Sequence, residues 1–239
     1  MNILKPQEIF LKNLTEASFI DEISKNAEKD VFSKISFTDE TVANVKLFDI
    51  TFEYCKFTNI NMEQGKLEKT TFSDVIFTNC NFSNTKFLES NFIRCEFNNC
   101  KIAGSDFTDA RFYNVGIIEA NANYINLSMA SLERVLFKNT TLKNSYFSET
   151  TLKEVYFQKV NLQEAQVFNT SLKGIDISEC DILGISIGLE DIKGAIIDIY
   201  QAVDLMYLIC VKIKYRNRND MVNITVSFLF LCKIVNYYY

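Results

Sequence analysis

The sequence predicts an all-β solenoid, a parallel β-helix whose coils each contain four short strands. Three observations lead to this fold class. From Phe32 to Ile197 every fifth residue is apolar, without interruption. With one exception up to residue 185, the residue two positions before each apolar centre is small, β-branched or a thiol, and the other three positions are mostly polar. A period of five fits neither an α-helix, whose side chains repeat about every 3.6 positions, nor an extended strand, whose side chains alternate.

Each five-residue unit is expected to form one strand and one turn. Two inward residues separated by an outward residue describe a strand of three residues, so the other two residues turn the chain. The position two after the centre is often Asn, Asp or Gly, which tolerate a left-handed backbone. If each unit turns the chain by about a right angle, four units close a coil, and about eight coils stack roughly 4.8 Å apart.

Residues 20 apart should then be neighbours in adjacent coils, and like residues recur at this spacing. Asn59, Asn79 and Asn99 are one such series. Stacked Asn side chains satisfy one another's amide groups, so this ladder has a physical reason. Glu40 is the one residue that departs from the inward pattern.

The segment 1–30 precedes the five-residue period and mixes apolar and charged residues. We expect it to be an N-terminal cap with one short helix near residues 16–28. A stack of repeats needs such a cap, because its terminal coil otherwise exposes apolar side chains and unpaired strand edges to water.

The repeat resembles a known family. Units such as Cys80-Asn-Phe82-Ser-Asn, Ala110-Arg-Phe112-Tyr-Asn and Val160-Asn-Leu162-Gln-Glu are similar to the consensus Ala-(Asp/Asn)-Leu-X-X of pentapeptide repeat proteins. That family folds as a right-handed quadrilateral parallel β-helix. The resemblance implies this fold for residues 31–197.

The segment after the repeats resembles the closing segment of Qnr-like pentapeptide repeat proteins and their relatives in low-GC Gram-positive bacteria. It reads Tyr200-Gln-Ala-Val-Asp-Leu-Met-Tyr-Leu-Ile209. In that family a short helix caps the rod and pairs two rods end to end. The resemblance implies that residues 198–215 are a C-terminal helix and dimerisation cap, so the partner is a second copy of the chain. Its apolar stripe is Ala202, Leu205, Met206, Leu208 and Ile209.

Residues 216–239 fall outside both patterns. The apolar run from Ile224 to Cys232 is much shorter than the ~20 residues that a membrane-spanning helix needs. We interpret this stretch as a disordered or loosely attached strand-forming tail. A tail that touches a membrane and an anomalous extension of the coding frame are the alternatives.

Composition argues against catalysis and metal binding. The chain has no His, which removes the commonest general base and a common metal ligand. Seven Cys are scattered, without a CxxC pair, so Cys80 and Cys100 are interpreted as small core residues rather than metal ligands. We expect reduced thiols and a cytoplasmic location, since the start of the chain lacks a secretory signal. No catalytic, cofactor-binding or metal-binding residue is predicted, and the chain is not expected to be an enzyme.

Function is expected on the outer faces of the rod. Five outward carboxylates are candidates for an acidic partner-binding surface: Glu89, Glu96, Asp106, Asp109 and Glu119. The resemblance to Qnr-like proteins implies a DNA mimic that binds DNA gyrase or topoisomerase IV and modulates quinolone sensitivity. The alternatives are an ordinary solvated surface and a scaffold that binds another protein. The mildly acidic body disfavours direct contact with nucleic acid, and no membrane partner is expected.

Overall fold

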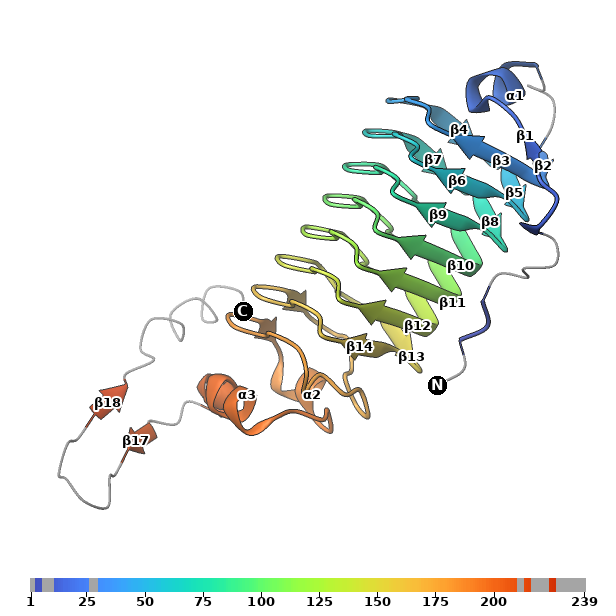
Figure 1. Ribbon diagram of the computed structural model, residues 1–239. Coiled ribbons are helices and arrows are strands. Elements are labelled where there is room, and N and C mark those ends of the chain that lie inside the picture. The colour runs from blue at the N-terminus through green and yellow to red at the C-terminus, as the bar shows by residue number, and fades with distance from the viewer. Residues whose placement is uncertain (1–2, 6–10, 26–29, 210–212, 216–223, 227–239) are drawn as a thin grey trace. The chain divides into compact units, whose positions relative to one another are not determined.

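The computed structural model describes residues 3–5, 11–25, 30–209, 213–215 and 224–226. The chain divides into two compact units between Ile196 and Ile197. The first unit is a stack of coils (Figure 1) in which parallel strands pair residues 20 apart, as in Phe52 with Phe72 and Phe92 with Phe112. The predicted quadrilateral parallel β-helix is therefore confirmed.

Eight coils make up the rod, from coil 1 (31–50) to coil 8 (171–190). Each coil has four faces, numbered here in chain order. In coil 4 the inward residues at the centres of faces 1 to 4 are Phe92, Phe97, Ile102 and Phe107, and all four are buried. Residues whose numbers differ by a multiple of 20 lie on the same face in different coils.

Faces 1 and 2 carry a 12-stranded parallel sheet, whereas face 4 carries short two-stranded pairs and face 3 only isolated bridges. Face 1 contains β2 (Val31–Ser33), β5 (Thr51–Glu53), β8 (Thr71–Ser73) and β13 (Thr151–Lys153). Face 2 contains β1 (Thr15–Glu16), β3 (Ile35–Thr38), β6 (Lys56–Thr58), β9 (Ile76–Thr78) and β14 (Tyr156–Gln158). Both faces are crossed by β10 (Asn91–Asn98), β11 (Arg111–Ile118) and β12 (Ser131–Lys138). Face 4 contains β4 (Lys46–Phe48), β7 (Lys66–Glu68), β15 (Gln166–Val167) and β16 (Ser186–Ile187).

The corners between faces have a left-handed backbone. Every residue two after a centre, from Lys34 to Gly174, has a φ between 50° and 78°. The sequence predicts this where Asn, Asp or Gly occupies the corner. The structure imposes it equally on long side chains such as Arg94 and Arg134, because the ladder of hydrogen bonds above and below overrides the local preference.

Phenylalanine rings fill the interior of the first coils. Along face 1, Phe52, Phe72 and Phe92 stack with centroids 5.1–5.4 Å apart and ring planes 10° from parallel. Neighbouring columns meet edge to face, as in Phe72 and Phe87 at 6.3 Å. The Phe residues at the apolar centres therefore form the core of these coils.

The N-terminal cap contains β1 and helix α1 (Phe19–Lys25). Strand β1 pairs with β3 at the spacing of one coil, Thr15 beside Ile35, so the coil register begins before residue 31. Phe19 is buried, and its ring centroid lies 5.2 Å from that of Phe37. Phe19 therefore covers the N-terminal end of the Phe columns.

The exceptional Glu40 anchors this cap. Its carboxylate accepts hydrogen bonds from the backbone N–H of Phe19 (2.6 Å) and from the Ser18 hydroxyl (3.0 Å). The unpaired N–H groups at the start of α1 are thereby satisfied by a negative charge placed at the positive end of the helix.

At the other end of the rod lies the short helix α2 (Leu189–Ile192). The Asp191 carboxylate accepts hydrogen bonds from the backbone N–H groups of Asn169 (3.1 Å) and Thr170 (2.9 Å). Asp191 follows coil 8 in the chain and accepts from N–H groups of coil 7. Glu40 plays a similar part at the other end, where it accepts from N–H groups of the N-terminal cap.

The second unit begins with helix α3 (Ile199–Asp204) and a 3₁₀ helix, η2 (Leu205–Ile209). Asp198 and Gln201 form a reciprocal capping box at the start of α3. Strands β17 (Ile213–Tyr215) and β18 (Ile224–Val226) pair antiparallel; Cys210 and most of the 216–239 tail lie outside the described residues. Among the residues described, no helix combines the length and the apolar character needed to cross a bilayer.

Candidate functional site

The five candidate carboxylates occupy two opposite sides of the rod. Glu89, Asp106 and Asp109 lie on face 4 or at its corner with face 1, because they flank the centres at 87 and 107. Glu96 lies on face 2 within β10, and Glu119 at the corner that follows face 2. They therefore do not form a single stripe, since a four-sided coil separates faces 2 and 4 by half a turn.

On face 4, Asp106 is held in place by its neighbours. It accepts hydrogen bonds from the Thr108 hydroxyl (2.6 Å), the Thr108 backbone N–H (3.1 Å) and Asn126 Nδ2 (3.1 Å). Asn126 stands directly beside Asp106 in the next coil. The Asp106 carboxylate is thus fixed in orientation rather than free to rotate.

Glu89 and Asp109 stand one coil apart in the same corner column, which we call the face 4 column. Its exposed members with carboxylates are Asp49, Glu89, Asp109 and Glu149. Lys69 interrupts the column and lies 3.8 Å from Glu89. Because both side chains are well exposed, this ion pair contributes little to stability. Carboxylates occupy four of the eight positions of the column, and the other positions include Met129, Asn169 and Leu189.

The carboxylates on face 2 are partly engaged elsewhere. Glu96 receives the Lys5 ammonium at 3.4 Å and a hydrogen bond from Asn98 Nδ2 at 3.4 Å. Glu119 lines an open surface cavity of about 340 Å³ together with Asn99 and Lys101. This side of the rod is therefore less acidic than the face 4 column.

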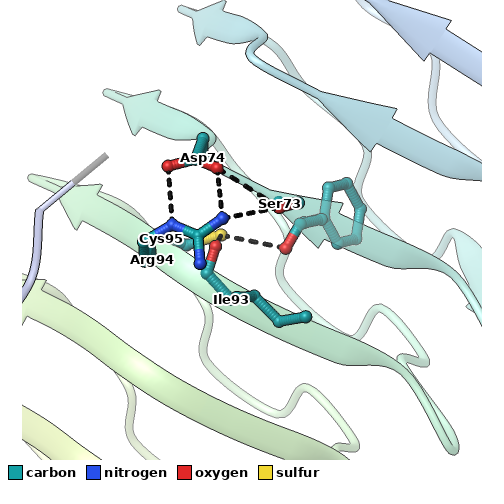
Figure 2. A network of polar contacts seen from close by, with 6 residues as sticks. Ser73, Asp74, Ile93, Arg94 and Cys95 are labelled. Carbon is teal, nitrogen blue, oxygen red and sulfur yellow. Dashed lines mark hydrogen bonds and ion pairs between the residues drawn. The ribbon is translucent and has the colours of Figure 1, made fainter. Parts of the chain in front are cut away.

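A buried ion pair was missed from the sequence. Arg94 and Asp74 stand one coil apart in the corner column between faces 1 and 2, and the Asp74 side chain is fully buried. Figure 2 shows the guanidinium fork against the carboxylate, with Nε–Oδ1 at 2.8 Å and Nη2–Oδ2 at 2.5 Å, and Ser73 alongside. The Asp74 carboxylate raises the pKa of Arg94.

This ion pair decides whether the positive charge of Arg94 offsets the acidic surface. Its charge is neutralised by Asp74 in the same corner column between faces 1 and 2, so Arg94 does not oppose the face 4 carboxylates. Opposite charges at equivalent positions of successive coils are the sequence signal that would have revealed it.

The cysteines of the described residues are free thiols buried inside the rod. Burial raises the pKa of Cys55 to about 11 and that of Cys95 to about 12. Cys80 and Cys100 stand in adjacent coils, and their thiols donate to backbone carbonyls of the preceding coils. Among the described residues, no group of three His, Cys, Asp or Glu side chains is arranged to hold a metal ion.

The residues predicted for dimerisation lie on α3 and η2. Leu205 is only 8% exposed, Ala202, Met206 and Leu208 are half-buried, and the side chain of Ile209 lies outside the described part. The apolar side chains that α3 exposes most are instead Ile199 (74%) and Tyr200 (79%).

Solved structures of several repeat proteins are similar to this chain. HetL from the cyanobacterium Nostoc sp. strain PCC 7120, described as involved in heterocyst differentiation regulation, is 14% identical, with 74% of this chain and 94% of HetL covered and a TM-score of 0.39. A trypsin-treated form of QnrB1, a plasmid-mediated fluoroquinolone resistance protein, is 20% identical, with coverages of 76% and 88% and a TM-score of 0.40. Rfr23 from Cyanothece 51142 is 13% identical, with coverages of 68% and 91% and a TM-score of 0.21. A search of curated proteins found no match.

Family models identify the repeats directly. The model described as "Pentapeptide repeat region" matches residues 90–167, and the model "Pentapeptide repeats (8 copies)" matches residues 47–84 and 55–92. Together they span half of the chain, from coil 1 to coil 7. Because the TM-scores are below 0.5, the assignment rests on these models and on the stacking of residues 20 apart. The chain belongs to the pentapeptide repeat family.

Proposed function

We propose that this protein is a non-catalytic interaction protein that binds a partner through the outer faces of its rod. The observation that carries this proposal is the filled interior. The Phe rings lie in contact, as in Phe77 and Phe97 at 4.6 Å, and the small cavity between coils 6 and 8 has only about 10 Å³. Such a space holds at most about one water molecule, so a substrate has no room inside the coils.

The partner that we propose is a type II topoisomerase, DNA gyrase or topoisomerase IV, with the rod acting as a DNA mimic. The face 4 column supports this, because its carboxylates repeat at multiples of the coil spacing of about 4.8 Å and stand at exposed corners. The similarity of residues 200–209 to the closing segment of Qnr-like proteins supports it as well. A row of fixed negative charges can compete with DNA for a basic surface.

Gyrase supercoiling, with and without ciprofloxacin, tests this proposal. Purified protein is titrated into the assay at micromolar concentrations. The expected result is that supercoiling resists the drug, or is inhibited, in a concentration-dependent way. Raising the salt concentration should weaken the effect, because the attraction between exposed charges is screened.

Two double variants locate the interaction. Glu89→Lys with Asp109→Lys reverses the charge of the two adjacent carboxylates in the middle of the face 4 column and should abolish the effect. Glu96→Lys with Glu119→Lys changes the net charge equally on the opposite side and should leave the effect in place. If the wild-type protein neither protects nor inhibits gyrase, the topoisomerase proposal fails, and a scaffold for another protein becomes the better description.

A further inference from the structure

The rod is open on two of its faces between coils 7 and 8. Strands β13 and β14 pair only with β12 of the preceding coil, and Figure 1 shows them as the last strands of their sheet. Within the described chain, no backbone hydrogen bond joins residues 151–159 to residues 171–179. The same two coils remain joined on face 3, where Asn161 bridges Asp181, and on face 4, where β15 pairs with β16. The separation is therefore a wedge rather than an end of the stack.

Coil 8 turns its faces 1 and 2 toward the chain that follows it. Leu172 donates its backbone N–H to Asp191 (2.8 Å), and Ile177 donates to Ile196 (2.9 Å). The left-handed corner at position 179 is also missing, although corners are present without a break from Lys34 to Gly174. Coil 8 thus keeps the usual forward ladder on these two faces, at the same spacing of 19 residues as in earlier coils, and lacks only the ladder from coil 7.

The wedge leaves a row of unpaired backbone donors on coil 7. In earlier coils each centre residue and the residue two after it donate to the next coil, as Leu142 does to Asn161 (2.7 Å) and Asn144 does to Gln163 (3.0 Å). The corresponding N–H groups in the opening belong to Leu152, Glu154, Phe157 and Lys159, and no residue of coil 8 accepts from them. An edge of this kind is a template for another strand.

The opening is large and has an apolar floor. Segments 152–158 and 173–179 line a cavity of about 610 Å³. Leu152 is the only central residue between Phe32 and Ile187 that is not buried. Leu152 and Phe157 also line the interior of the rod, so the floor is continuous with the core. Both charge signs occur at the rim, in Lys153, Glu154, Lys173 and Asp176.

We propose that this opening binds an extended segment of a partner protein, which adds as a parallel strand to the free edge of β13 and β14. The ligand chemistry follows from the site. Four backbone donors at strand and corner spacing require main-chain carbonyls, which an extended peptide presents at that spacing. The apolar floor favours apolar side chains at the inward positions of the added strand, and the mixed rim selects no single charge. The site is separate from the face 4 column and does not depend on a topoisomerase partner.

A peptide that copies β12, acetylated and amidated Ser-Leu-Glu-Arg-Val-Leu-Phe-Lys, is a suitable probe. β12 already pairs with β13 and β14 in parallel from the other side. On the free edge the peptide would place its Leu, Val and Phe over the apolar floor. The control peptide carries N-methyl groups on its third and sixth residues, whose N–H groups would donate to carbonyls of coil 7.

Residue-resolved amide exchange of the full chain gives the readout. In the free protein, the amides of Leu152, Glu154, Phe157 and Lys159 should exchange much faster than their equivalents one coil earlier, Leu132, Arg134, Phe137 and Asn139. The probe should slow the first four by about tenfold or more and leave the second four unchanged, and the N-methylated peptide should have no effect.

Three results would overturn the proposal. The first is a free protein that protects the four amides as strongly as those of coil 6, which would mean that the opening is already closed. The second is exchange that stays unchanged at millimolar probe. The third is equal protection by both peptides, which would show that main-chain pairing is not the mode of binding.

Discussion

At the scale of single residues, Glu40 departs from the repeat pattern and binds the N-terminal cap that covers the first coil. From Cys55 to Ile185 every inward position of this series is buried. The Glu40 carboxylate instead lies at the start of α1 and accepts from the N–H groups of the cap. A carboxylate in the core without such donors would be costly, so Glu40 and α1 depend on each other.

We predict that Glu40→Ala lowers the free energy of unfolding by about 1 kcal/mol, the usual cost of losing a helix cap. Urea denaturation measures this change. Glu40→Gln keeps one acceptor oxygen and should lose less. A Glu40→Ala protein as stable as the wild type would mean that the contacts of Glu40 with the start of α1 contribute nothing to stability.

The buried thiols predict a loss of stability at alkaline pH. Burial raises the pKa of Cys95 from an ordinary value of 9.0 to about 12. Between these values the unfolded chain ionises and the folded chain does not, so the free energy of unfolding falls as the pH rises. The stabilisation is fully present below pH 9 and decreases by about 1 kcal/mol per pH unit for this thiol.

Urea denaturation at pH 8, 9 and 10 checks this prediction in the wild type and in Cys95→Ala. The variant starts from a lower stability because it creates a small cavity, but its stability should fall less steeply with pH. Equal slopes in the two proteins would show that Cys95 does not contribute.

Among the residues of the candidate site, the sequence correctly indicated which side chains point outward but not which share a side. Glu96 and Asp106 are separated by half a coil in the sequence, so they face opposite ways. Once a coil of 20 residues with four faces is accepted, the spacing along the sequence is sufficient to assign each carboxylate to its side. Asp74 and Arg94 could have been paired by the same rule, because they occupy equivalent positions of successive coils.

At the scale of elements, the Phe columns make the first coils the most tightly packed. Phe92 contacts the rings of Phe72 and Phe112 in its own column, at 5.1 and 4.9 Å. We predict that Phe92→Ala lowers the free energy of unfolding by about 3–5 kcal/mol. Leu152→Ala should cost clearly less, because Leu152 is partly exposed beside the opening and its removal creates no enclosed void.

Thermal or urea denaturation of both variants provides the measurement. If Leu152→Ala is as damaging as Phe92→Ala, then coil 8 closes over coil 7 in solution. The comparison therefore also tests the opening independently of any peptide.

The period of five predicted the coils and the strands of faces 1, 2 and 4, whereas face 3 forms only isolated bridges. The period did not predict the opening. The apolar centres continue through Leu172 and Ile177 without interruption, so the pattern gives no sign that the ladder is broken there. On these faces coil 8 still pairs forward with residues 191–196 and lacks only its pairing with coil 7. A pattern of apolar centres does not record which neighbouring coils are hydrogen-bonded.

At the scale of the whole molecule, we predict a homodimer formed through the C-terminal helix. Sedimentation should give twice the chain mass of 27.6 kDa. Leu205→Asp should give a monomer, because a charge replaces an apolar contact. Circular dichroism of the variant checks that the rod remains folded.

Tyr200→Asp is the companion variant, since Tyr200 is the most exposed apolar side chain of α3. Loss of the dimer in this variant alone would place the interface on the exposed side of α3 rather than on Leu205 and its neighbours. An unchanged mass in both variants would exclude this helix as the interface.

The stacking of residues 20 apart also limits how such a chain can change its length. Removing one full coil, such as residues 91–110, brings Arg111 onto the partner that Asn91 had, and every later side chain keeps its direction. Removing a single pentapeptide unit rotates everything after it by about a quarter turn. A surface that depends on one side of the rod can therefore be inherited intact only through insertions or deletions of whole coils.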